Sequence, residues 1–104
     1  MKNMKQEEND FDIENALESV REGAIQVWIK NCYIAFDTVL EEGIDTDDAS
    51  ERMEILTALR KVLALFEVRE EYEKCQKLSW ILECEFPGYD TTPDRNHIES
   101  LGIY

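Results

Sequence analysis

The sequence predicts an all-α fold, a small bundle of three long helices followed by a short C-terminal helix, in one domain comprising residues 1–104. Apolar residues recur at the 3.6-residue spacing of a helix face in three long stretches. Glycine and proline stand where those stretches end, at Gly43, Pro87-Gly88 and Gly102. A chain of 104 residues, 43% of them apolar, can bury a core without a disulfide or a metal.

The first long helix is expected to contain the densest apolar run, residues 24–40. Its main face carries Ile25, Trp28, Ile29, Cys32, Phe36, Val39 and Leu40. Upstream, Leu17, Val20 and Val27 follow helical spacing on a face about 110° away. Gly23 lies near this change of face, so either one long helix presents two faces or the chain bends there into two helices. We favour one long helix that could bend at Gly23.

The start of this helix is expected at Asp10 or Asp12, either of which can accept hydrogen bonds from the first amides of a helix. Residues 1–10 show no apolar periodicity and are predicted to be a frayed terminus.

The second long helix is expected at residues 49–67. Gly43 suits the left-handed position that ends the first helix, and Asp48 with Glu51 has the spacing of a capping box. The main apolar face of this helix carries Ile55, Leu56, Leu59, Val62, Leu63 and Phe66. Ala58 and Leu65 widen the face, which indicates burial against two neighbours.

The third helix is expected at residues 71–86, with Tyr72, Cys75, Leu78 and Leu82 on one face. Residues 69–71 contain no glycine or proline, so the second and third helices either continue as one rod or form a hairpin. We favour the hairpin, because a monomer of this size could not cover the rod. Thr92 and Pro93 then have the pattern of a cap and first turn, so a short helix is predicted at residues 93–101.

The formal net charge of −13 restricts the classes of partner. It argues against binding to a nucleic-acid backbone or to an anionic membrane surface, both of which require a basic face. It favours a protein partner with a basic surface. The N-terminus has no apolar core of a signal peptide, no segment is apolar enough to span a membrane, and the three cysteines are an odd number. These features predict a cytoplasmic protein.

No pattern in the chain indicates catalysis or a cofactor, so the protein is predicted not to be an enzyme. Cys32, Cys75, Cys84 and His97 lack the ligand spacing of a zinc site, so we interpret the cysteines as buried packing residues. The acidic stretch 41–51 lacks the glycine and glutamate positions of a calcium loop. The remaining glutamate rows are interpreted as solvated helix faces.

Two sets of residues are predicted to bind partners. The acidic set carries six carboxylates and no base within residues 41–51: Glu41, Glu42, Asp45, Asp47, Asp48 and Glu51. The apolar set contains side chains that the bundle is not expected to cover: Tyr33, Leu40, Leu65, Trp80 and Ile81. Alternatively, the C-terminal segment, through Ile98, Leu101 and Tyr104, could fold over Trp80.

We therefore expect a small acidic binding protein that engages a basic surface of a partner, as an inhibitor or nucleic-acid mimic. In composition it resembles the small phage inhibitors that occupy nucleic-acid-binding grooves. The alternative is a structural or assembly protein that acts as a homo-oligomeric helical bundle, with a homodimer as the expected state.

Overall fold

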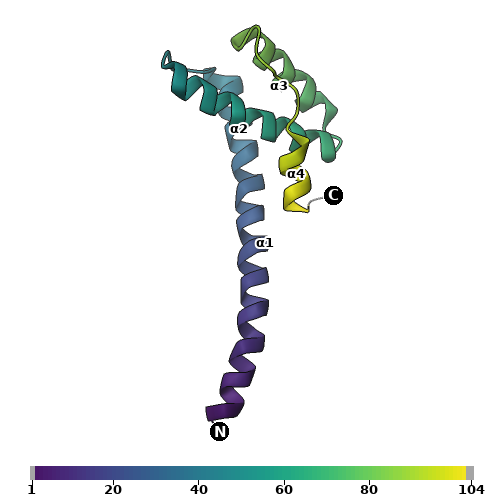
Figure 1. Ribbon diagram of the computed structural model, residues 1–104. Helices are drawn as coiled ribbons and strands as arrows, with labels where there is room; N and C mark the ends of the chain where they lie inside the picture. Colours follow the sequence, from purple (N-terminus) through teal and green to yellow (C-terminus); the bar gives the residue numbers. More distant parts are fainter. Residues whose placement is uncertain (1, 103–104) are drawn as a thin grey trace. The chain divides into compact units, whose positions relative to one another are not determined.

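The structure is a computed structural model that describes the backbone of residues 2–102 and the side chains of residues 16–102. The described residues form four helices and no strand: α1 (Lys2–Glu42), α2 (Ala49–Val68), α3 (Tyr72–Glu85) and α4 (Arg95–Leu101), shown in Figure 1. The all-α prediction is confirmed. That the three long helices form a bundle stays a prediction.

Helix α1 is longer than the sequence analysis expects. It begins at Lys2 and continues through Gly23 without interruption. The expectation that the helix begins at Asp10 or Asp12 is therefore wrong. Adding a residue to an existing helix is much easier than nucleating one, and Lys, Met, Gln and Glu, which dominate residues 2–8, are good helix formers. A helix can thus extend into a segment that has no apolar stripe.

The chain divides into two units, an N-terminal unit of residues 1–31 and a C-terminal unit of residues 32–104. Residues 2–31 of α1 belong to the N-terminal unit, and residues 32–42 of the same helix belong to the C-terminal unit. That the whole chain is a single domain stays a prediction.

Helix α2 is the central helix of the C-terminal unit. It contacts both α3 and α4, and Figure 1 shows these two helices beside it. The buried residues of α2 are Leu56, Leu59, Val62, Leu63, Ala64, Leu65 and Phe66. Partner residues from the other helices are Leu78 and Leu82 of α3 and Ile98 of α4, all with 0% exposure. From the end of α1, the rings of Tyr33 and Phe36 lie 5.2 and 5.1 Å from that of Phe66.

The predicted hairpin between α2 and α3 is present. Glu70 has a left-handed backbone with φ of 60°, and the amide of Glu71 donates to the carbonyl of Phe66 at 2.9 Å. This is the hydrogen-bond pattern that commonly ends a helix at a glycine. Here a glutamate occupies the glycine position, which explains why the sequence contains no visible break.

Helix α4 begins two residues later than predicted. Asp94, rather than Thr92, is the cap, and its Oδ1 accepts a hydrogen bond from the amide of His97 at 3.3 Å. The carbonyl of Thr92 instead accepts from Nε of Arg60 at 2.8 Å, while the amide of Asp94 donates to the carbonyl of Arg60 at 3.0 Å. These bonds fix the segment before α4 against α2.

Candidate functional site

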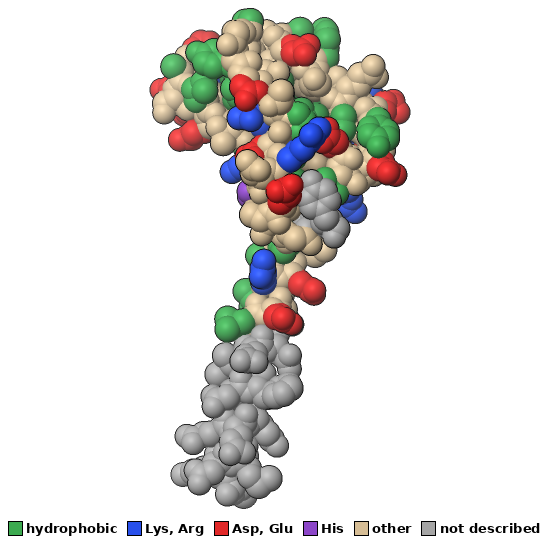
Figure 2. All heavy atoms as spheres, turned by 45° about the vertical axis from the view of Figure 1, so that its right-hand side comes forward, with side chains coloured by type: hydrophobic (Ala, Val, Ile, Leu, Met, Phe, Trp, Pro, Cys, Tyr) green, Lys and Arg blue, Asp and Glu red, His purple; other side chains and the backbone are tan. Residues whose placement is uncertain are grey.

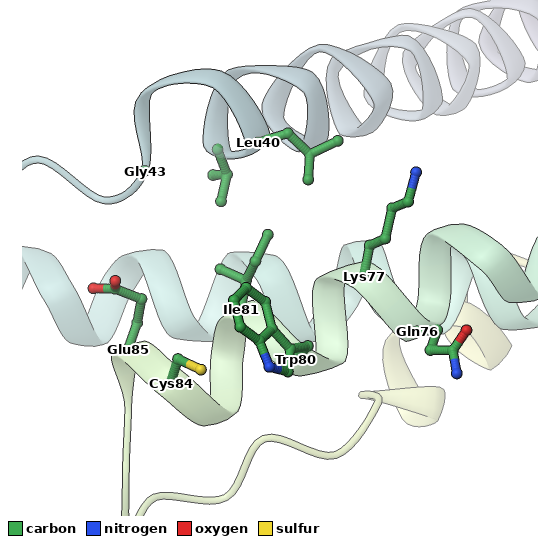
Figure 3. A pocket seen from close by; sticks show the side chains of 9 residues that line it. Leu40, Gly43, Gln76, Lys77, Trp80, Ile81, Cys84 and Glu85 are labelled. Atoms are coloured by element: carbon green, nitrogen blue, oxygen red, sulfur yellow. The ribbon is translucent and has the colours of Figure 1, made fainter.

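An open groove of about 580 Å³ lies between the end of α1 and one face of α3, within the C-terminal unit. Its walls are mostly apolar. The lining residues are Val39, Leu40 and Gly43 from α1 and the residue after its last turn, and Gln76, Lys77, Trp80, Ile81, Cys84 and Glu85 from α3. In Figure 3, Leu40 faces Ile81 and Trp80 across the groove, with Lys77 toward one end and Glu85 toward the other.

The spacing of residues on α3 explains why this face remains open. Leu78 and Leu82 are one turn apart and are fully buried against the core. Trp80 is two residues from each leucine, which at about 100° per residue is about 200° around the helix in one direction and about 160° in the other. It therefore points away from that core. It is 67% exposed, and Leu40 is 43% exposed. Because tryptophan presents a large apolar surface and is enriched at interfaces, this exposure makes the groove a candidate binding surface.

Three of the five predicted apolar residues thus line one groove: Leu40, Trp80 and Ile81. Among the described residues Trp80 stays 67% exposed, and Tyr104, part of the segment that could fold over it, lies outside the described part of the chain.

The prediction that Leu65 belongs to the uncovered apolar set is wrong. Leu65 is fully buried, whereas the sequence analysis expected it to need cover from another molecule. Five consecutive residues of α2, 62–66, are buried, because α3, α4 and the end of α1 all supply residues to the core around this helix. The width of the apolar face alone indicates only two neighbours for α2.

Tyr33 takes part in packing within the C-terminal unit rather than lining the groove. Its ring is tilted against that of Phe66, and its hydroxyl donates a hydrogen bond to Glu71. The guanidinium of Arg69 lies 5.7 Å from the ring centroid. Burial, together with the hydrogen bond to Glu71, raises the pKa of Tyr33 to about 12. The tyrosine therefore keeps its proton at any physiological pH.

The acidic segment, residues 41–51, begins at the edge of the groove, because Gly43 lines the groove and directly follows Glu41 and Glu42. All six of its carboxylate side chains are exposed. Two of them have a structural role. Asp48 caps α2 by accepting from the amide of Glu51 at 3.0 Å, and Glu51 accepts from the hydroxyl of Thr46 at 2.6 Å.

The other four acids, Glu41, Glu42, Asp45 and Asp47, make no ion pair within the described residues. Glu41 and Glu42 lie in the last turn of α1, which contains no basic residue. The C-terminus of a helix carries a partial negative charge, so two carboxylates there destabilise it by about 0.3–1 kcal/mol each at low salt. The arrangement concentrates negative potential at one end of the groove.

Arg52 connects the acidic segment to α3. Its guanidinium donates to the carbonyl of Thr46 at 3.0 Å, and to the carbonyl and Oε1 of Glu85 at 2.8 and 3.2 Å. It also lies 5.0 Å from the ring centroid of Phe86. The sequence does not indicate this role of Arg52, because Glu85 is 33 residues away in the chain and no local pattern connects the two residues.

The cysteines do not share one environment. Cys32 is buried, and burial raises the pKa of its thiol to about 11. Cys75 is half-buried and donates weakly to the carbonyl of Leu63, with its sulfur 3.9 Å from the oxygen. Burial and the nearby Glu67 raise the pKa of the Cys75 thiol. Cys84 is exposed and lines the groove, so the prediction that it is a buried packing residue is wrong.

The described residues contain no group of three or more His, Cys, Asp or Glu side chains placed to hold a metal ion. None of the described helices is long and apolar enough to cross a membrane.

Comparison with protein-family models, with curated proteins and with solved structures finds no match to this chain. Function is therefore inferred from the groove and the acidic segment.

Proposed function

We propose that this protein is a non-enzymatic binding protein that holds a basic, amphipathic helix of a partner protein. An apolar side chain of that helix would enter the groove, and its lysines or arginines would face the acidic segment. The observation that supports the proposal is that the acidic segment begins beside the groove. Gly43 lines the groove, and Glu42 and Asp45, which make no ion pair within the described residues, lie within two residues of it.

The dimensions of the groove support an apolar anchor. Its volume of about 580 Å³ can hold one or two large side chains. Peptide helices bind to such grooves with apolar residues one turn apart, while their polar face stays in water. Lys77, Trp80, Ile81 and Cys84 follow this helical spacing on α3, so a helix lying along α3 would contact the whole row.

Electrostatics supports a cationic partner over a neutral or anionic one. Glu41, Glu42, Asp45 and Asp47 repel one another and add to the negative end of α1. Lysine or arginine from a partner would relieve this repulsion and speed association. The net charge of −13 is negative, like the charge of a phosphate backbone. A basic surface that normally binds nucleic acid would therefore also attract this protein. The protein would then be an inhibitor that mimics nucleic acid.

The test uses a synthetic helical peptide of leucine and lysine, with a leucine and glutamate peptide of the same pattern as control. Tryptophan emission should shift to the blue only with the basic peptide, and affinity should fall by about tenfold or more as salt rises from low to high. Equal binding of both peptides, or an affinity indifferent to salt, would contradict the proposal.

Two variants with the same change in net charge separate the acidic segment from overall charge. The first replaces Glu41, Glu42, Asp45 and Asp47 by their amides, which spares the cap Asp48. The second replaces four exposed acids elsewhere by glutamine: Glu18, Glu22, Glu54 and Glu99. The first should slow association with the basic peptide strongly and the second only weakly.

A further inference from the structure

The part of α1 that precedes the C-terminal unit exposes a row of large apolar side chains. Leu17 is 64% exposed, Val20 67% and Val27 59%. Ile34, 53% exposed, continues the same spacing along the helix. In Figure 2, hydrophobic side chains lie along one side of the described part of the N-terminal unit and acidic ones along the other. A helix with such a row needs a partner surface.

The spacing of the row identifies the kind of partner. From Leu17 to Ile34 the seam residues are separated by 3, 4, 3, 4 and 3 positions: Leu17, Val20, Ala24, Val27, Asn31 and Ile34. This alternation repeats every seven residues, which keeps a row facing a second helix in a two-stranded coiled coil. At about 1.5 Å per residue the seam is about 26 Å long.

The charges beside the seam permit a second copy of this acidic chain to bind there. In a coiled coil the positions next to the seam come close to the partner helix. In this chain they are Ala16, Arg21, Gly23, Trp28, Lys30 and Ala35, and none of them is acidic. The two acids within residues 16–35, Glu18 and Glu22, fall at positions away from the seam. Two copies can therefore pair without placing carboxylates against each other.

Asn31 specifies the orientation of the pair. It is the one polar residue in the seam. In a parallel pair it lies opposite its own copy, where two amides can hydrogen-bond, whereas in an antiparallel pair it would lie near Val20 and be buried against an apolar side chain. A single asparagine at this type of position specifies the register and the number of strands. We infer that this protein forms a parallel coiled-coil homodimer through the seam Leu17–Ile34 of α1.

Sedimentation equilibrium of the full chain from about 10 to 500 µM tests the inference, since a seam this short gives a weak dimer. Val20→Glu with Val27→Glu should weaken dimerisation about a hundredfold, because it places charges in the seam. The matched control, Ser19→Glu with Gln26→Glu, adds the same charge one residue away from the seam and should leave most of the affinity intact.

A variant that is expected to strengthen the dimer gives a result that loss of folding cannot produce. Asn31→Val should tighten dimerisation by about tenfold, because it removes a buried amide from the seam. Far-UV circular dichroism and urea unfolding at low concentration check that the variants fold. A monomer at every concentration, or a dimer equally sensitive to both charge variants, overturns the inference.

Disulfide trapping tests the orientation. With the exposed Cys84 replaced by serine, Val20→Cys should link two copies under mild oxidation, because position 20 faces its own copy only in a parallel pair. Ser19→Cys should not link them. Equal linking of both variants, or a dimer that Trp80→Ala abolishes while the seam variants do not, would assign self-association to another surface.

Discussion

Replacing Arg52 by alanine should destabilise the C-terminal unit and loosen the end of the groove. The side chain is 25% exposed and makes three hydrogen bonds, to Thr46 and Glu85. Each contributes about 1 kcal/mol net, and the contact with the Phe86 ring about 0.5–1 kcal/mol. Because Glu85 is 39% exposed, its ion pair with Arg52 adds little beyond the hydrogen bond. The expected loss is about 2–3 kcal/mol, allowing for overlap between these contributions.

Urea unfolding at pH 7, followed by circular dichroism, measures this loss as a lower midpoint at unchanged slope. Arg52→Lys should recover less than half of it, because one ammonium cannot reach both carbonyls in the geometry of a guanidinium. Arg21→Ala removes an exposed arginine from the N-terminal unit and should change the stability by less than about 0.5 kcal/mol. If Arg52→Ala also stays within that range, the connection between the acidic segment and α3 does not exist in solution.

Three further predictions concern stability. Glu70→Gly should stabilise the protein by about 0.5–1 kcal/mol in urea unfolding, because glycine adopts the left-handed backbone without strain; a destabilised variant would show that the turn does not have this conformation. Burial and the nearby Lys61 lower the pKa of His97, so the stability that its neutral form provides is present above about pH 6.5 and is lost as pH falls below it. His97→Gln should flatten this part of the pH profile, and an unchanged profile would contradict the assignment. Cys32→Ala should cost about 1–3 kcal/mol through a cavity, and a chelator should leave the melting temperature unchanged; a melt that depends on the chelator would reveal a metal site.

The sequence predicts α2, α3 and the end of α1 well because each has an apolar stripe, although the end of α2 at Glu70 carries no glycine or proline. Val62 and Phe66 show the helical period in α2, and Gly43 adopts the left-handed backbone expected after α1, with φ of 71°. The start of α1 at Lys2 could not be found in this way, because a helix that extends from an existing one needs no apolar pattern.

The candidate site is predictable only in part. Trp80 and Ile81 could be recognised because they fall off the buried stripe of α3, and this reasoning uses only local spacing. The error at Leu65 arises because burial depends on how many neighbours surround α2, which a single helix pattern does not contain. Arg52 was missed for the same reason: its contact with Glu85 exists only once the chain has folded.

The most direct test of the binding proposal is a nuclear magnetic resonance titration of the full, isotopically labelled chain with the leucine and lysine peptide. We expect the largest chemical-shift changes at Leu40, Gly43, Ile81 and the indole of Trp80, with smaller ones at Glu42 and Asp45. These changes should be absent with the leucine and glutamate peptide. Binding that leaves the groove unperturbed and shifts Leu17, Val20 and Val27 instead would contradict it.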